Sequence, residues 1–277
     1  MRFRTFTKVI LALCISLATF VSGIVFTDGA IAGTNLPLTY DQIRGTGLAN
    51  TCPDVFSSSR SRSIIPIPKG GSVQITNMCL QPTSFFVKEE SNNKRKEAEF
   101  VAAKLMTRAT SSLDYVKAEV KLNDDGSLTL TEKEGMDYQP ITVQMPGGER
   151  VAILFSIKGF TATTRPGFTG ISTSTDFEGE TDVPTYRGAN FIDPKGRGLA
   201  IGYDAAEALP GKRDSYSKST KDDRTSKGKI SLQIAKLNSE TGEIAGTFEC
   251  EQFSGTDLGA IEAKEVIIRG IFYANIS

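Results

Sequence analysis

Short segments in which apolar and polar residues alternate recur along most of the chain. The clearest two run from Asp114 to Leu122 and from Ser127 to Glu132. A two-residue period places alternate side chains on opposite faces of a strand, and the Asn-Asp-Asp-Gly sequence at 123–126 is typical of a hairpin turn. The pattern therefore predicts a β-hairpin whose inward-facing residues are Val116, Ala118, Val120 and Leu122, opposite Leu128 and Leu130.

Further segments of this kind follow at the spacing of an antiparallel meander, without the pattern of a crossover helix. The last is so apolar that it needs cover on both faces, which predicts that it pairs with an early strand. The sequence thus predicts an all-β fold, a closed antiparallel β-barrel of about eight strands. The expected strands are Val73–Leu80, Phe85–Lys88, Phe100–Leu105, Ile141–Met145, Arg150–Phe160, Thr169–Thr175, Asp176–Val183, Lys229–Leu237, Glu243–Phe253 and Glu265–Ile276.

Residues 184–228, which we call the head loop, interrupt this series between two late strands. Insertions of this length in a compact domain are usually functional or disordered. In the first half, Lys195, Arg197, Asp204 and apolar side chains such as Tyr203 are interspersed with glycines, a composition that suits a docking surface. Asp204 and Glu207 form a capping-box pattern that predicts a short helix ending at Pro210. The second half is nearly bare of apolar residues, so we expect it to be mobile.

The N-terminal segment has the features of an export signal. Three basic residues precede the apolar run Val9–Val25, and Ala30-Ile31-Ala32 fits a signal-peptidase site. A membrane anchor is the alternative, because 17 residues lie at the short edge of spanning length. The cleavage motif favours a signal peptide at 1–32, followed by a single β-barrel domain at 33–277.

Composition excludes several classes of protein. Lys+Arg and Asp+Glu both number 32, and cleavage at Ala32 would remove three basic residues and one acidic residue. The resulting slight negative charge argues against binding to nucleic acid. The absence of histidine excludes Ser-His-Asp and Cys-His catalysis and ordinary catalytic zinc sites. A hydrolase that uses Asp and Glu remains open, although no aromatic-rimmed cleft accompanies any carboxylate pair.

The four cysteines have different expected fates. Cys14 would leave with the signal peptide, and Cys52 and Cys79 would then lie in a compartment where disulfides persist, so we pair them. Cys250 alternates with Ile244 and Phe248 on an expected strand, which predicts a buried, inert thiol.

Two glycine- or aspartate-rich motifs do not match the sites that they resemble. The glycines of 196–202 have the wrong spacing and no preceding strand for a dinucleotide site. The turn at 123–126 lacks the closing glutamate of a calcium loop. The residues alone therefore predict an exported, disulfide-linked barrel that binds a partner without catalysing a reaction. An exported ligand-binding barrel is the alternative.

The head loop also carries a family resemblance. The motifs at 193–198, 202–204 and 208–210 resemble the manganese-stabilising extrinsic proteins of photosystem II, the PsbO family. Further similar motifs occur in the same order through the expected mature chain. They are 38–41, 87–90, 93–95, 97–100, 139–150, 174–177, 241–246 and 272–274.

The resemblance implies a non-catalytic subunit in the thylakoid lumen, peripheral to the membrane. It would cover the manganese–calcium–oxo cluster, bind no metal directly, help to retain calcium and chloride, and shape water and proton paths. Its implied partners are reaction-centre subunits, chlorophyll-binding antenna subunits and other extrinsic lumenal subunits. Lys195, Arg197 and Asp204 would be polar contacts of the head loop, and Asp41 an N-terminal contact. Cys52 and Cys79 match the family disulfide.

Overall fold

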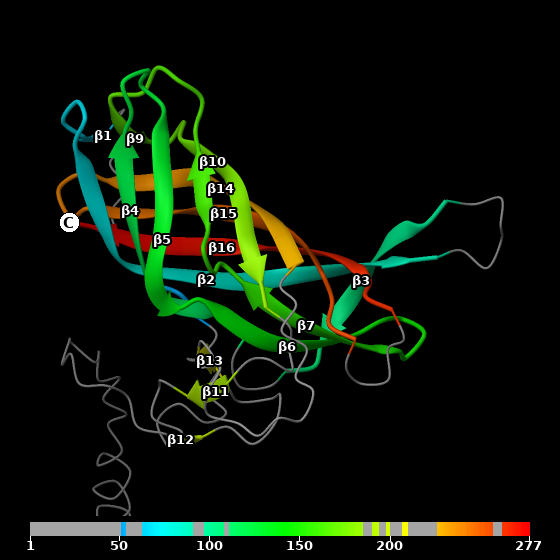
Figure 1. Ribbon diagram of the computed structural model, residues 1–277. Helices are drawn as coiled ribbons and strands as arrows, with labels where there is room; N and C mark the ends of the chain where they lie inside the picture. Colours follow the sequence, from blue (N-terminus) through cyan, green and yellow to red (C-terminus); the bar gives the residue numbers. More distant parts are fainter. Residues whose placement is uncertain are drawn as a thin grey trace, which may run out of the picture. The chain divides into compact units, whose positions relative to one another are not determined.

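Eight antiparallel strands of the described residues form a closed ring (Figure 1). The computed structural model describes residues 51–53, 63–90, 97–107, 111–184, 226–256 and 262–277, and the backbone of three short strands between 190 and 209. Each ring strand pairs with the next, and the last pairs with the first. In ring order they are β2 (Ser72–Glu89), β16 (Glu265–Ile276), β15 (Glu243–Phe253), β14 (Ser226–Asn238), β10 (Asp176–Val183), β8 (Thr161–Thr163), β5 (Leu128–Met136) and β4 (Leu113–Leu122).

The seam between β2 and β16 confirms that the last strand pairs with an early one. Pairing runs from Val266 opposite Val87 to Ile276 opposite Ile75. The two segments expected at 73–80 and 85–88 are parts of the one strand β2. They stay continuous because the residues between them also pair with β16, so that Pro82 lies opposite Gly270.

The interior of the ring is filled by apolar side chains from every strand around it. The predicted hairpin of β4 and β5 is confirmed, and Val116, Val120, Leu128 and Leu130 are each at most 1% exposed. Burial of these side chains is the main source of free energy that favours folding. These side chains form one continuous core inside the ring.

A branch sheet extends the ring at one end. The first part of β2 pairs with β4, whereas Phe85–Glu89 pairs with β3 (Glu99–Leu105). The end of β3 pairs with β6 (Tyr138–Gln144), and β6 forms a hairpin with β7 (Arg150–Ser156). The Phe155 ring of β7 stacks on Phe248 of β15, with ring centroids 5.5 Å apart. The branch sheet is therefore packed onto the ring.

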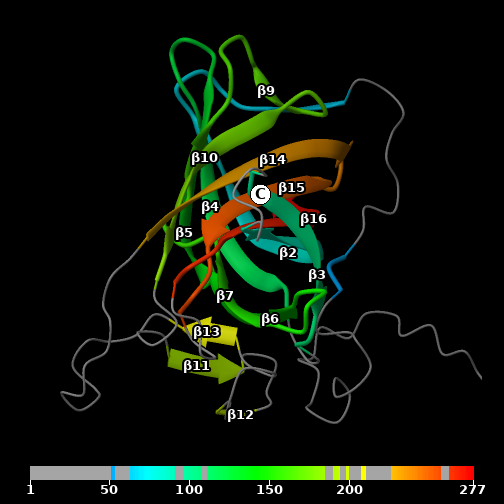
Figure 2. The same cartoon turned by 90° about the vertical axis from the view of Figure 1, so that its right-hand side faces the viewer.

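At the opposite end of the ring, β1 (Ile64–Pro66) pairs with β9 (Gly170–Ser172). Figures 1 and 2 show this small ladder at the far end from the β6–β7 hairpin. The two ends of the barrel thus carry different additions.

The head loop leaves the ring after β10 and returns at β14, which begins at Ser226, two residues before the expected end of the loop. It contains the strands β11 (Asn190–Asp193), β12 (Gly198–Leu199) and β13 (Glu207–Leu209), and β11 pairs with both of the others. The prediction of a helix from Asp204 to Pro210 is wrong at 207–209. Pairing with β11 and β6 satisfies the backbone there, which a local capping motif does not reveal.

The predicted signal peptide at 1–32 and the second half of the head loop, 211–224, lie outside the described residues. Among the residues that are described, no helix is long and apolar enough to cross a membrane.

Candidate partner-binding surface

The residues predicted to contact a partner, Asp41, Lys195, Arg197, Tyr203 and Asp204, lie outside the described residues. The structure therefore tests neither their positions nor their contacts. It does describe the base to which the head loop is attached. We call Asp137, Tyr138, Ser156, Lys158 and Asp182 the head-loop root.

Tyr138 connects the head loop to the branch sheet. Ala208 of β13 lies opposite Tyr138 of β6, and Tyr138 also pairs with Ser156 of β7. The Tyr138 side chain is only 1% exposed. Since Tyr138 lies in a continuous ladder, its backbone fixes where β13 joins the sheet.

Lys158 connects the root to the last residues of β10, from which the head loop leaves. Its carbonyl oxygen accepts a hydrogen bond of 2.7 Å from the Asp182 amide and one of 2.9 Å from the Thr181 hydroxyl. Ser156 Oγ donates to the Asp182 carbonyl oxygen at 2.6 Å. Four strand ends therefore meet at the root: those of β5, β6, β7 and β10.

The side chain of Lys158 reaches a buried carboxylate. Its Nζ donates to Asp137 Oδ2 at 2.9 Å, and the Asp137 side chain is 4% exposed compared with 33% for Lys158. Burial raises the pKa of Asp137, and the hydrogen bond and charge of Lys158 oppose that shift. The pair combines a buried acid with a lysine that still reaches water.

Glu132 is a second carboxylate with a perturbed pKa near this pair. Its pKa is raised mainly by burial and further by the charge of Asp137, while the Gly159 amide, which donates to Oε2 at 2.9 Å, lowers it. Asp137 Oδ1 and Glu132 Oε1 are buried and accept no hydrogen bond within the described part. Burying these groups costs free energy, so the root is not optimised for stability alone.

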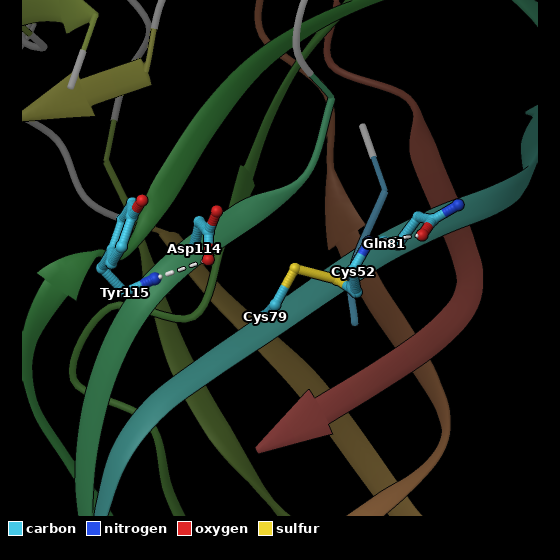
Figure 3. Close-up of a disulfide and its surroundings, with 5 residues drawn as sticks. All are labelled: Cys52, Cys79, Gln81, Asp114 and Tyr115. Atoms are coloured by element: carbon cyan, nitrogen blue, oxygen red, sulfur yellow. Dashed lines mark hydrogen bonds between the residues drawn. A yellow bond between two sulfur atoms is a disulfide. The ribbon is translucent and has the colours of Figure 1, made fainter. Parts of the chain in front are cut away.

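The disulfide between Cys52 and Cys79 is present, as predicted (Figure 3). The two Cα atoms are 5.7 Å apart, and the Cys52 amide donates to Gln81 Oε1 at 2.8 Å. The bridge packs with Ala245 and Tyr273 in a small cluster separate from the main core. It therefore attaches the N-terminal segment to β2 from outside the ring core.

Cys250 is a free thiol and is fully buried, as predicted. Burial raises its pKa, so the reactive thiolate is disfavoured.

The described residues contain no group of three or more His, Cys, Asp or Glu side chains placed to hold a metal ion. The Asn123–Gly126 segment is a turn, as expected: Asp125 Oδ1 accepts hydrogen bonds from the Ser127 amide at 2.9 Å and hydroxyl at 2.7 Å.

Sequence reasoning missed the head-loop root. Asp137 and Lys158 are 21 residues apart and carry no motif, so only the fold brings them together. The available signal was weak: Asp137 lies between Met136 and Tyr138, just before the apolar strand β6.

Comparisons with known proteins match the whole expected mature chain. The family model described as manganese-stabilising protein / photosystem II polypeptide matches residues 36–276. Photosystem II extrinsic protein O of Nostoc sp. is 54% identical, with 100% of each chain covered. The protein of the same name from Thermosynechococcus vestitus is 51% identical, with 100% of this chain and 99% of that one covered.

The similarity extends to a eukaryotic alga. Oxygen-evolving enhancer protein 1, chloroplastic, of Volvox carteri is 43% identical over 92% of this chain and 87% of its own length. The chain therefore belongs to the family of manganese-stabilising proteins, which are photosystem II polypeptides.

Proposed function

We propose that this protein is an extrinsic subunit on the lumenal side of photosystem II, where its head loop docks over the oxygen-evolving manganese–calcium cluster. The cluster is held by other subunits. The protein stabilises it by excluding bulk water and reductants, by helping to retain calcium and chloride, and by ordering groups around its ligands. Binding only to the assembled state also stabilises that state by mass action.

One observation in particular supports docking through the head loop. The loop is joined to a base of paired strands by Ala208 opposite Tyr138 and by the hydrogen bond that the Asp182 amide donates to the Lys158 carbonyl oxygen. A rigid base lowers the entropy lost when a binding segment is held in one orientation. The apolar ring interior offers little support for the alternative, an exported ligand-binding barrel.

We infer that Lys195, Arg197, Tyr203 and Asp204 contact reaction-centre and antenna subunits, and that Asp41 makes a further contact near the N-terminus. The charged residues would set the register of the complex, and Tyr203 would bury apolar surface. Export to the thylakoid lumen by a signal peptide at 1–32 belongs to the same proposal. A mature protein beginning at Gly33 by mass spectrometry would support it, and an uncleaved chain would contradict it.

Rebinding to photosystem II tests the docking proposal. Membranes stripped of extrinsic proteins by salt or urea would be titrated with the wild type, with Arg197→Ala and with Arg165→Ala, while bound protein and oxygen evolution are followed. Arg165 is an exposed arginine beyond β8, at the other end of the ring, so it is a matched control. We expect Arg197→Ala alone to weaken rebinding, with an unchanged thermal transition. Equal rebinding of all three proteins would contradict docking through Arg197.

A further inference from the structure

Tyr115 near the start of β4 has a backbone conformation that side chains rarely adopt. Its φ is 55°, the only positive φ of a described residue other than glycine. In this left-handed region Cβ approaches the following carbonyl oxygen, which destabilises any residue other than glycine. Strained residues of this kind persist where the surrounding structure holds them, often at functional sites.

Tyr115 lies in a bulge that affects the pairing on both sides of β4. Between Met78 and Leu80, β2 has only Cys79, whereas β4 has Asp114 and Tyr115. On the other side, Tyr115 and Val116 oppose only Gly135 of β5. Two residues opposite one is the arrangement of a β-bulge, which redirects a side chain out of the regular alternation.

The neighbours of Tyr115 accommodate this conformation. Gly135 has a φ of 143°, and a Cβ at that position would lie 2.5 Å from the Tyr115 carbonyl oxygen. Asp114 Oδ1 accepts a hydrogen bond of 3.0 Å from the Tyr115 amide (Figure 3). A side chain larger than that of glycine at 135 would therefore clash with the bulge.

Burial of the Tyr115 side chain does not compensate for the strain. The residue is 51% exposed, whereas Leu113 and Val116 on either side of the bulge are fully buried. The barrel therefore holds an unfavourable backbone conformation and leaves an aromatic residue half in water. Tyrosine is enriched at the energetically dominant positions of protein interfaces, because its ring buries apolar area while its hydroxyl bonds at the rim.

Strand pairing and the disulfide link the bulge to chain that continues into each of the two segments proposed above to dock. Asp114 pairs with Met136, and two residues further on Tyr138 pairs with Ala208 of the head loop. On its other side the bulge faces Cys79, which is bonded to Cys52 at the end of the N-terminal segment that contains Asp41. Both connections place Tyr115 beside chain that leads into a docking segment.

We propose that Tyr115 is a docking anchor whose ring inserts into an apolar pocket on a photosystem II subunit. The inference rests on the proposed function and adds a contact surface on the barrel itself, at the bulge in β4. The strain at Tyr115 then serves binding, since an unstrained strand residue would not present the ring in this direction.

The test separates binding from stability with Tyr115→Gly. Glycine relieves the strain, so we expect a thermal transition at least as high as that of the wild type. Loss of the anchor should weaken rebinding to stripped photosystem II membranes by about tenfold. Tyr115→Phe should rebind within a few-fold of the wild type. Phe253→Ala, which removes an aromatic residue that is 46% exposed on β15, should rebind unchanged.

Two results would overturn the inference while leaving the proposed function intact. Rebinding of Tyr115→Gly at wild-type affinity would show that the ring has no partner. A thermal transition clearly below that of the wild type would show that the ring stabilises its own chain. Failure of the wild type itself to rebind would overturn the proposed function together with the inference, so the two failures can be distinguished.

Discussion

The interior of the ring and the head-loop root are built from different kinds of side chain. The ring is filled by aliphatic and aromatic groups such as Leu130 and Ile268, which are at most 1% exposed. The root buries the Asp137 carboxylate, ion-paired to Lys158. Burial of apolar side chains stabilises the fold but does not fix the orientation of one segment relative to another. Hydrogen bonds do, because their strength depends on angle as well as distance. The comparison indicates that the ring supplies stability and the root supplies orientation.

The raised pKa values of two carboxyl groups at and beside the root reflect the free-energy cost of burying their charge. Burial raises the pKa of both Asp137 and Glu132. The folded protein therefore binds protons more readily at these two groups than the unfolded chain does. A region selected for stability alone would contain apolar side chains here, so the retained charges suggest a role in holding the head loop.

The largest expected change in the free energy of unfolding comes from a substitution where the branch sheet packs on the ring. Phe155→Ala removes a fully buried ring stacked on Phe248, and the cavity should lower the free energy of unfolding by about 3–5 kcal/mol. Urea denaturation measures the change, with the exposed Phe253→Ala as control. A loss below about 1 kcal/mol would mean that the branch sheet is only loosely held.

Removing the disulfide should have the next largest effect. Cys52→Ser releases a cross-link between residues 27 apart and should lower the free energy of unfolding by about 2–4 kcal/mol. Thiol reductant should destabilise the wild type by a similar amount and leave Cys52→Ser unaffected. An unchanged denaturation midpoint on full reduction would show that the ring does not depend on this link.

Lys158→Met tests the polar root directly. It leaves the Asp137 carboxylate buried without its ion-pair partner, which should cost about 2–3 kcal/mol at neutral pH, less than for a fully buried pair because Lys158 is partly exposed. The deficit should shrink at acidic pH, where Asp137 becomes protonated. Denaturation midpoints across a pH series measure both effects, and a deficit independent of pH would contradict the assignment to Asp137.

In the wild type, protonation of Asp137 should also change stability with pH, but by less than in Lys158→Met. Because the pKa of folded Asp137 is raised, its contribution to the free energy of unfolding should fall as pH rises from the ordinary pKa of 3.8 through the folded pKa, and then level off. Glu132 adds a fall of the same sign, starting at its ordinary value of 4.5. Asp137→Asn should remove the contribution of Asp137, so the stability difference between the wild type and this variant should fall with pH through this window. A difference that rises with pH would contradict the raised pKa of Asp137.

The smallest change in the free energy of unfolding is expected for a substitution in an exposed ion pair of the ring. Lys88 Nζ and Glu265 Oε1 are 2.7 Å apart across the seam between β2 and β16, with side chains that are 36% and 46% exposed. Solvent screens such pairs, so Lys88→Gln should change the free energy of unfolding by less than about 1 kcal/mol. Thermal denaturation at low and high salt checks this. A larger, salt-sensitive loss would mean that surface charge helps to close the ring.

The alternating pattern of the sequence predicted most of the ring, because strand burial follows a two-residue period. The hairpin of β4 and β5, the pairing of the last strand with an early one and the buried Cys250 were all correct. Family membership also confirms the prediction of a stabilising subunit in place of an enzyme. The prediction was wrong for 207–209, where a capping motif suggested a helix and pairing with β6 and β11 gives a strand.

The sequence by itself determined the fold class, the disulfide and the family, because each is encoded in residues that are close together or in a residue type that is rare. Only the tertiary structure decided the head-loop root and the bulge at Tyr115. The pair of Asp137 with Lys158 joins the β5–β6 connection to the turn after β7, and the fit of Tyr115 against Gly135 joins two strands. Such contacts depend on strand register, and register is fixed by the packing of the whole sheet and not by any local pattern.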